Sequence, residues 1–493
     1  MSDNLRRLAV RGAFWSGVQQ VSDRGLRMIV IGILATLVEP RAIGVVALAM
    51  VFIDGSGILL NQGLTAALVQ REQLTQSHKS SAFMANLFTA FVLVVALHLA
   101  AGPISAWLGN PELERLLRWL SIGFVFTGLA SVQEAHLRRE FRFRALAVRT
   151  LISRTAGAIL GVVLALRGHG AWSLVFMYLA NQGVGALVLW FASPWRPSLR
   201  FSWASYKELF DFGLKMLGVE ALNIMKDRGT DLVVGSMLGE TALGFYSLGR
   251  TLVGGIFALV NGTIRPVVWT AMSRLQDNRQ KLVSAVEEST QLTAAVVLPV
   301  GAGLLLAAPT LVAVLYGDRW LPALPVMYGL AVSPMFMTVS AHSRIALAVT
   351  GRVNVNLLLS GLGVILTLGA VIAGSQWDLA GVAVGLVLAT AIQTPINILC
   401  TSRLLQLNTG RLLLQLVPPA LLTSVMSLIL FFLRPTFGGG WLGLALMVSS
   451  GVLIYGLGSL VVAPALIGRI RENLVPGAER RTIPRRTDSF IED

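Results

Sequence analysis

Apolar stretches recur along the whole chain, and short polar segments separate them. An apolar helix needs about 20 residues to cross the ~30 Å hydrocarbon core of a bilayer, and these stretches reach that length. The pattern predicts an all-α polytopic membrane protein with about fourteen transmembrane helices. The expected spans are residues 12–37, 42–69, 80–101, 115–136, 145–166, 170–192, 209–238, 241–271, 285–307, 322–343, 353–374, 379–402, 412–433 and 441–462.

One stretch, residues 219–250, places ionisable groups where its apolar flanks predict lipid. A charge in hydrocarbon costs at least ~2.5–3.5 kcal/mol, so these side chains must face protein or water. At about 100° per residue, five polar side chains share one face of the predicted helix: Glu220, Asn223, Asp227, Thr230 and Asp231. Lys226 and Arg228 flank that face on opposite sides. The stretch therefore predicts a wet stripe along a membrane helix.

Composition and charge agree with a membrane protein. The chain is 55% hydrophobic and 13% charged, which is too apolar for a soluble protein of 493 residues. A net charge of +15 could indicate nucleic acid as a partner, but 26 of the 40 Lys and Arg residues fall in alternate loops and the tail. This positive-inside pattern predicts cytoplasmic termini and no nucleic-acid role. The run LRREFRFR at 137–144 is accordingly interpreted as a topology and headgroup anchor.

An internal repeat runs through most of the chain. LVEPRAIGVVALAM at 37 aligns with MLGETALGFYSLGR at 237 at an offset of 200, so that Gly44 meets Gly244. AHLR at 135 matches AHSR at 341 with offset 206, and WLGNPE at 107 matches LYGDRW at 315 with offset 208. Each copy holds six spans, an even number, so the copies share one membrane orientation and are related by an axis along the membrane normal.

The repeat predicts the domain organisation. We expect an N-lobe of six helices at 1–200, a C-lobe of six helices at 201–408, two further helices within 409–462 and a cytoplasmic polar tail at 463–493. These are two pseudo-symmetric six-helix lobes plus two C-terminal helices.

The repeat also gives the wet stripe a counterpart. In the first span, five polar side chains share one helical face: Ser16, Gln20, Asp23, Arg24 and Arg27. The offset of 200 takes Gln20 to Glu220, Asp23 to Asn223 and Arg27 to Asp227. We therefore expect two lobes that face each other across a polar cavity on the pseudo-axis.

The charges inside the predicted membrane region are mainly cationic. Arg250, Asn261 and Arg265 share a sector of the eighth span, and Asp54, Arg154 and Lys215 are further isolated cases. A salt bridge within the membrane remains the alternative for any one of them. Taken together, these charges predict a cavity for an anionic substrate, because guanidinium groups match phosphate oxygens bidentately. The bases are Arg24, Arg27, Lys226, Arg228, Arg250 and Arg265, against the acids Asp23, Asp54, Glu220, Asp227 and Asp231.

Enzymatic motifs do not stand out in the sequence. It contains no GxSxG, HExxH or P-loop pattern, so we expect a transporter without a cofactor rather than an enzyme. Cys400 is the single cysteine, which excludes intrachain disulfides and cysteine metal clusters. His136 and His342 occupy matching repeat positions, where a structural or headgroup role is favoured over proton coupling.

Two stretches resemble Wzx-type polysaccharide and lipopolysaccharide O-unit flippases, of the multidrug/oligosaccharidyl-lipid/polysaccharide exporter superfamily. These are LATLVEPRAIGVVALAMVFIDGSGILLNQGLTAALVQR at 34–71 and DLVVGSMLGETALGFYSLGR at 231–250. The likeness is greatest to bacterial exopolysaccharide exporters. It implies a bacterial inner-membrane protein that rocks between inward-open and outward-open states and flips undecaprenyl-pyrophosphate-linked oligosaccharides.

The resemblance also implies roles for the intramembrane charges. Substrate binding falls to seven cavity residues: Arg24, Arg27, Lys226, Arg228, Arg250, Arg265 and Asn261. Ion antiport is common among relatives, with H⁺ or Na⁺ as the coupling ion, and the candidate acids are Asp23, Asp231, Asp227 and Glu220. The implied partners are the lipid-linked oligosaccharide, membrane lipids, and a polysaccharide polymerase with its export machinery.

Two other functions stay open. A cation-coupled multidrug antiporter of the same superfamily would need acids and aromatic residues in its cavity, and the excess of arginine disfavours it. A membrane polysaccharide polymerase would carry a large periplasmic loop with catalytic arginines. The predicted external loops of this chain are short.

Overall fold

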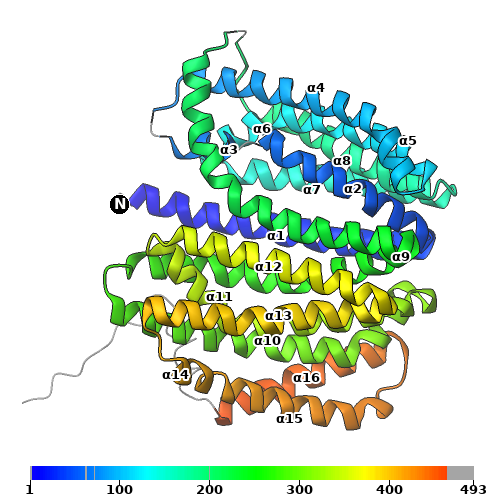
Figure 1. The fold of residues 1–493 in the computed structure, drawn as a ribbon, viewed down its shortest axis with the longest axis vertical. Helices are drawn as coiled ribbons and strands as arrows, with labels where there is room; N and C mark the ends of the chain where they lie inside the picture. The colour runs from blue at the N-terminus through cyan, green and yellow to red at the C-terminus, as the bar shows by residue number, and fades with distance from the viewer. Residues whose placement is uncertain (1–2, 62–63, 72, 199, 463–493) are drawn as a thin grey trace, which may run out of the picture.

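The computed structural model describes residues 3–61, 64–71, 73–198 and 200–462, and within these ranges it contains helices and no strand. The all-α prediction is confirmed. The helices run back and forth beside one another (Figure 1), and α1 begins at the same end of the bundle as α16 ends. We call this the near end; the far end holds the turn from α1 into α2. In chain order the helices are α1 (Asp3–Leu37), α2 (Pro40–Asn61), α3 (Leu64–Gln70), α4 (Gln76–Trp107), α5 (Pro111–Ser121), α6 (Gly123–Arg139), α7 (Phe143–Leu166), α8 (Ala171–Ala192), α9 (Trp203–Arg274), α10 (Arg279–Tyr316), η1 (Asp318–Ala323), α11 (Leu324–Val349), α12 (Val353–Gly374), η2 (Ser375–Trp377), α13 (Asp378–Leu405), α14 (Thr409–Leu414), α15 (Val417–Leu433), η3 (Arg434–Thr436) and α16 (Gly440–Val462).

The helices account for the predicted number of membrane passages. Eleven helical stretches among the described residues are long and apolar enough to cross a membrane. Two of these stretches hold two helices each, because Ala221–Arg274 folds back at Gly239 and Val353–Leu405 contains both α12 and α13. α1 is not among the eleven because it carries seven charged residues, yet it runs the length of the bundle (Figure 1). With these additions the described part of the chain makes fourteen passages.

Gly239 divides α9 into two antiparallel halves. Its backbone has φ 85° and ψ 174°, a conformation that is essentially restricted to glycine. The matching turn of the first repeat, between α1 and α2, uses Pro40 as the first helical residue, where a fixed φ and a missing N–H are tolerated. Two different residues therefore produce the same reversal at the far end.

Other turns also recur in the two copies, at offsets of 208 and 210. Gly109 and Gly317 both have positive φ, 66° and 86°, where α4 and α10 end. Phe141 (φ 56°) and Gly351 (φ 77°) occupy the α6–α7 and α11–α12 turns. The backbone therefore reverses in the same way at corresponding places.

The two copies meet in a reciprocal contact at the far end. A side chain at Gly44 would overlap the carbonyl oxygen of Glu240, and one at Gly244 would overlap the carbonyl oxygen of Pro40. Because both pairs differ by 200, residue 44 meets residue 240 as residue 244 meets residue 40. This is the geometry of an isologous contact across a twofold axis. Glycine at both positions lets α2 and the second half of α9 approach closely.

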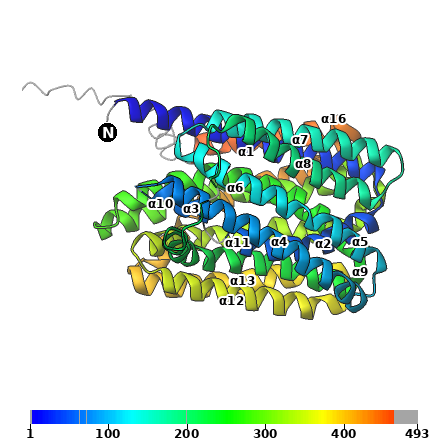
Figure 2. The ribbon, with the colours of Figure 1, turned by 90° about the horizontal axis from the view of Figure 1, so that it is seen from above.

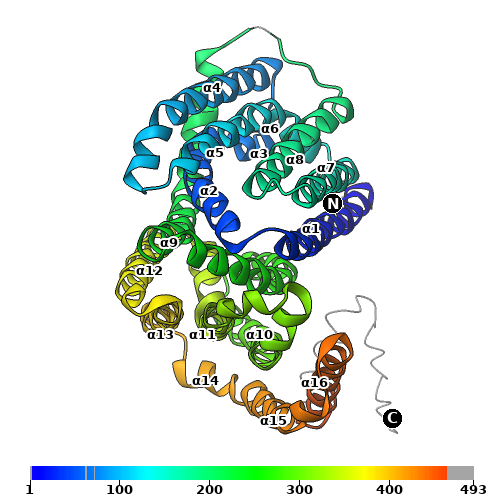
Figure 3. The ribbon, with the colours of Figure 1, turned by 90° about the vertical axis from the view of Figure 1, so that its right-hand side faces the viewer.

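The arrangement of the helices is clearest along their axes (Figure 3). α2 to α8 and the start of α9 gather on one side, and the rest of α9 lies with α10 to α13 on the other, while α15 and α16 lie outside α10, on which they pack. α1 lies between the two groups, and its start projects from the near end (Figure 2). Small and aliphatic residues of α1, α2, α9 and α10 fill the centre, including Leu34, Leu48, Val234 and Val312.

The outer surface is suited to lipid. Large apolar side chains are exposed on α4, α8, α12 and α15, for example Phe91, Phe191, Leu358 and Phe432. Water-soluble proteins rarely expose apolar patches of this extent, whereas hydrocarbon solvates them. The protein is therefore a multi-pass membrane protein.

Candidate functional site

A polar pocket of about 430 Å³, here the first pocket, lies between α1, α6, α7 and α8. Apart from its charged residues, the lining consists of amide and hydroxyl side chains. The charged lining residues are two acids, Asp23 and Glu134, and four arginines, Arg24, Arg138, Arg149 and Arg154. Because the arginines outnumber the acids, the interior of this pocket is cationic.

Both acids of the first pocket are engaged in ion pairs. Arg154 Nε donates to Asp23 Oδ1 at 2.6 Å, and Arg27 Nη2 donates to Asp23 Oδ2 at 3.2 Å. Arg138 Nη2 donates to Glu134 Oε1, also at 2.6 Å. The uncompensated charge of the pocket therefore falls on its other two arginines.

Those two arginines have no carboxylate partner among the described residues. Arg24 Nη1 donates to the carbonyl oxygen of Ala258 on α9 and lies against Gly262, where a Cβ would come within 2.7 Å of Nη1. Arg149 lies against Gly185, and its buried Nε has no hydrogen-bond partner in the described part of the chain. A buried donor without a partner costs free energy, so a bound anion would stabilise this arrangement.

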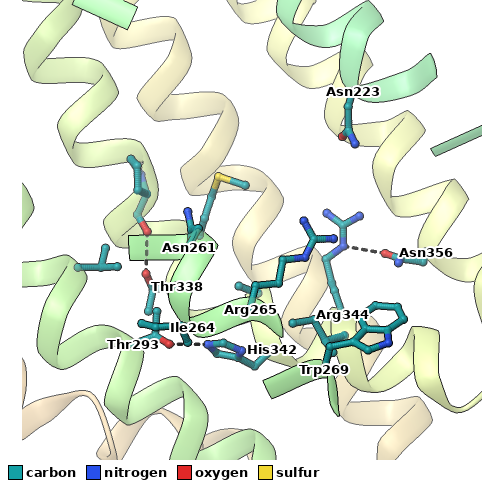
Figure 4. A pocket seen from close by; sticks show the side chains of 15 residues that line it. Asn223, Asn261, Ile264, Arg265, Trp269, Thr293, Thr338, His342, Arg344 and Asn356 are labelled. Atoms are coloured by element: carbon teal, nitrogen blue, oxygen red, sulfur yellow. Dashed lines mark hydrogen bonds between the residues drawn. The ribbon is translucent and has the colours of Figure 1, made fainter. Parts of the chain in front are cut away.

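A second pocket, of about 360 Å³, lies between α9, α10, α11 and α12 (Figure 4). Arg265 from α9 and Arg344 from α11 line it, and none of its described lining residues is an acid. Asn223 and Asn261 add amide groups, and Trp269 adds an indole ring that is 42% exposed. The second pocket thus combines two positive charges with neutral polar groups and an aromatic ring.

Hydrogen bonds to neighbouring side chains hold Arg344 and His342 of the second pocket in place. Arg344 Nε donates to Asn356 Oδ1 at 2.8 Å, and its Nη2 donates to Ser360 Oγ at 2.6 Å. His342 Nε2 lies 2.7 Å from Thr293 Oγ1 in a further hydrogen bond (Figure 4). All these partners are neutral, so the charge of Arg344 remains uncompensated.

The two pockets correspond to each other in the internal repeat. Asp23 of the first pocket matches Asn223 of the second at offset 200, and Arg138 matches Arg344 at offset 206. Where the first pocket has a carboxylate on α1, the second therefore has a neutral amide on α9. The two pockets are neighbours. Arg24 lines the first pocket and also contacts α9 at Gly262, next to Asn261 of the second pocket.

A cluster of four charged residues joins α2 to both halves of α9. Asp231 is fully buried and accepts hydrogen bonds from Arg228 Nη1 and Arg250 Nη2, each at 2.8 Å. Arg228 also pairs with Asp54 of α2, and Arg250 lies 5.9 Å from the ring centre of Tyr246. Two bases balance two acids, and none of the four lines either pocket. For these residues the geometry is that of an intramembrane ion-pair network.

The remaining predicted site residues are divided among several places. Arg27 lies beside the first pocket through its ion pair with Asp23. Lys226 and Asp227 on α9 line neither pocket, and neither forms an ion pair with a described side chain. The side chain of Glu220 lies outside the described part of the structure.

Sequence reasoning missed the pocket arginines on α6, α7 and α11. Arg138, Arg149 and Arg344 follow the positive-inside pattern, which assigns them to cytoplasmic segments, and Arg138 belongs to the run interpreted as an anchor. A signal for α7 was present, since Arg149 and Arg154 lie on one helical face with two hydroxyl residues between them, Thr150 and Ser153.

The fold and the pockets define a multi-pass helical membrane protein with a cationic polar interior. A family model described as polysaccharide biosynthesis protein matches residues 33–325, more than half of the chain. The chain belongs to this family. The resemblance to polysaccharide exporters that the glycine and apolar patterns carried is confirmed at this level.

Two curated relatives extend the match. The chain is 30% identical over 334 residues to the succinoglycan biosynthesis transport protein ExoT of Rhizobium meliloti (strain 1021), covering 67% of each chain. It is 25% identical over 394 residues to the lipopolysaccharide biosynthesis protein WzxC of Escherichia coli (strain K12), covering 79% of this chain and 80% of the relative. The first is named for the biosynthesis and transport of succinoglycan, and the second for the biosynthesis of lipopolysaccharide.

Among solved structures, the fold is similar to that of the lipid II flippase MurJ in an inward closed conformation. The TM-score is 0.71, and the match covers 93% of this chain and 100% of MurJ. Sequence identity is 13%, so this likeness concerns the fold alone.

Proposed function

We propose that this protein flips an undecaprenyl-pyrophosphate-linked oligosaccharide from the cytoplasmic to the periplasmic leaflet of the bacterial inner membrane. The observation that carries the proposal is the cationic first pocket, which lies between helices of a member of the polysaccharide biosynthesis family. A pyrophosphate must leave water to cross the membrane, and guanidinium groups replace its hydration shell. The relatives named for polysaccharide transport and lipopolysaccharide biosynthesis support the same substrate class.

Arg24 and Arg149 are the residues we assign to the pyrophosphate. Neither is neutralised by a carboxylate among the described residues, and Arg149 has a buried donor free to bind an oxygen. Arg154 and Arg27 hold Asp23, so their charge is partly compensated. The polyprenyl tail would stay in lipid outside the bundle.

Alternating access requires the two repeats to separate at the far end. Contacts between them there are close: Gly44 against Glu240, Gly244 against Pro40, and a 2.8 Å hydrogen bond from Asn110 to Glu240. We place the near end, where α1 begins, in the cytoplasm and the far end in the periplasm. The structure then corresponds to a state closed toward the periplasm, and rocking of the repeats would open it.

Among the acids proposed for ion coupling, Asp23 fits best. It lines the first pocket and its side chain is 27% exposed, so H⁺ or Na⁺ could reach it. Asp231 is fully enclosed between two arginines, and Asp227 lies outside both pockets. Protonation of Asp23 would release Arg154 and Arg27 for the substrate. A polysaccharide polymerase and export machinery would then act on the flipped units.

Export of polysaccharide from a deletion strain tests the proposal. Arg24→Ala and Arg149→Ala should each lower polymer output at least about tenfold at equal membrane abundance, because a charge-assisted hydrogen bond contributes ~1.5–3 kcal/mol. Arg411→Ala is the matched control, since Arg411 is exposed and lines neither pocket. Full output from the Arg24/Arg149 double variant would refute the assignment. Drug resistance on overexpression, with normal polysaccharide in the deletion strain, would favour the antiporter.

A further inference from the structure

The second pocket holds two like charges that converge without a counter-ion. Arg265 and Arg344 reach into the same space from α9 and α11 (Figure 4), and no acid is among the described residues that line the pocket. Like charges repel more strongly in a low-dielectric interior than in water. An anion between the two guanidinium groups would relieve this repulsion, which makes the pocket a candidate anion site.

Arg344 is oriented for such a ligand. Its Nε and Nη2 are held by Asn356 and Ser360 of α12, which leaves Nη1 without a hydrogen bond to any described residue. Arg265 makes neither a hydrogen bond nor an ion pair with the described part of the chain. One arginine is therefore fixed and the other is free to close on an anion, an arrangement suited to a carboxylate or a phosphate.

The neutral lining distinguishes between these anions. Trp269 offers an exposed ring face, on which the apolar face of a sugar can pack, and the amides of Asn223 and Asn261 are exposed to pair with hydroxyl groups. None of the described residues that line the first pocket is aromatic. A volume of about 360 Å³ lies at the small end of the range for ligand pockets, ~300–1,000 Å³, and fits part of an oligosaccharide.

We propose that the second pocket binds an acidic sugar of the lipid-linked oligosaccharide, with Arg265 and Arg344 on its carboxylate and Trp269 against its ring. The inference rests on the proposed function and adds that the transported unit is anionic in its glycan as well as in its pyrophosphate. The repeat shows where the two pockets differ. Asn223 stands where Asp23 stands in the first pocket, so the second pocket has an amide in place of the acid that pairs with Arg154.

Binding to the purified full-length protein tests this assignment with three probes. They are a disaccharide that contains glucuronic acid, its neutral glucose analogue, and inorganic pyrophosphate, each measured by calorimetry. The wild type should bind the acidic disaccharide at least about tenfold more tightly than the neutral one. Arg344→Gln and Arg265→Gln should each remove about tenfold of that affinity and leave pyrophosphate binding unchanged. Arg149→Gln should weaken pyrophosphate binding and leave the affinity for the acidic disaccharide unchanged.

Arg274→Gln is the matched control, because Arg274 is an exposed arginine on the same helix as Arg265 and does not line the pocket. Thermal unfolding of each variant checks that it folds. If Arg344→Gln does not fold, Arg344→Lys replaces it in the binding measurements. Equal binding of the acidic and neutral disaccharides by the wild type overturns the inference. Loss of pyrophosphate binding in Arg344→Gln but not in Arg149→Gln also overturns it and assigns the phosphate to the second pocket. The proposed function would fail on a different result, in the export assay: strains with Arg24→Ala and Arg149→Ala would then export polysaccharide normally.

Discussion

At the scale of single residues, the structure divides the intramembrane charges into compensated and uncompensated groups. Asp231 is surrounded by Arg228 and Arg250, and Asp54 completes a neutral cluster. Desolvated ion pairs contribute little net stability, but removing one partner leaves an isolated charge that costs much more. The cluster therefore matters for folding, whereas the uncompensated arginines of the pockets are available to a ligand.

Asp231→Asn is expected to destabilise the protein by ~3–5 kcal/mol, because two guanidinium groups would lose their shared carboxylate. The measurement is thermal or denaturant unfolding of the purified protein in detergent. Asp227→Asn is the control, since Asp227 is exposed on the same helix and pairs with no described side chain, and it should unfold like the wild type. Equal stability of the two variants would contradict the role given to the cluster.

At the scale of helices, glycine determines how closely the two repeats approach. Gly44 and Gly244 lie against backbone carbonyls rather than flexible side chains. A backbone carbonyl cannot move aside without shifting its helix, so an added methyl group must separate α2 from the second half of α9. These contacts lie at the far end, and both pockets depend on the positions of the same helices.

Gly244→Ala should destabilise the protein by ~1–3 kcal/mol through overpacking against Pro40. Gly254→Ala, on the same helix, is the matched comparison because a Cβ there meets nothing within 4 Å. That variant should be neutral or slightly stabilising, since alanine favours helix by ~1 kcal/mol over glycine. Unfolding measurements on both variants decide the matter, and an unaffected Gly244→Ala protein would argue against a tight interface.

At the scale of the whole molecule, the connection between the repeats is anchored to the first one. The backbone N–H of Ser202 donates to Ser81 Oγ of α4 at 2.8 Å. Glu208 at the start of α9 pairs with Arg71 at 2.5 Å and with His78 at 3.2 Å. By sequence these first residues of α9 belong to the second repeat, but their partners lie in the first. The start of α9 thus ties the two halves together at the near end.

This junction should depend on pH. Hydrogen bonds from His78 and Arg71 lower the pKa of Glu208 below its usual 4.5. A carboxyl group whose pKa is lower in the folded state stabilises that state above its unfolded pKa, and the contribution disappears as the pH falls through the lowered value. Glu208→Gln should therefore lower thermal stability near neutral pH and weaken its loss below pH ~4.5. Glu39→Gln, at an exposed acid on the α1–α2 turn, should leave the pH profile unchanged.

Hydropathy predicted the fold class and the spans, because burial in lipid is a local and nearly additive property of each stretch. Matching motifs at an offset near 200 predicted the repeat. Glycine positions in the sequence were also informative. A tight reversal or a close helix contact tolerates few residues other than glycine, as at Gly44 and Gly244. The same local reasoning correctly marked residues 219–250 as unusual, because charges in an apolar helix demand an explanation.

Only the tertiary structure decided which charges compensate one another. Arg228 pairs with Asp54, 174 positions away, and Arg154 pairs with Asp23 across 131 positions. A Coulomb interaction depends on distance in space, which neither periodicity nor loop charge reports. For the same reason Arg149 and Arg344 could not be distinguished from surface anchors in the sequence. Their positions in the pockets follow from the packing of α7 against α1 and α8 and of α11 against α9.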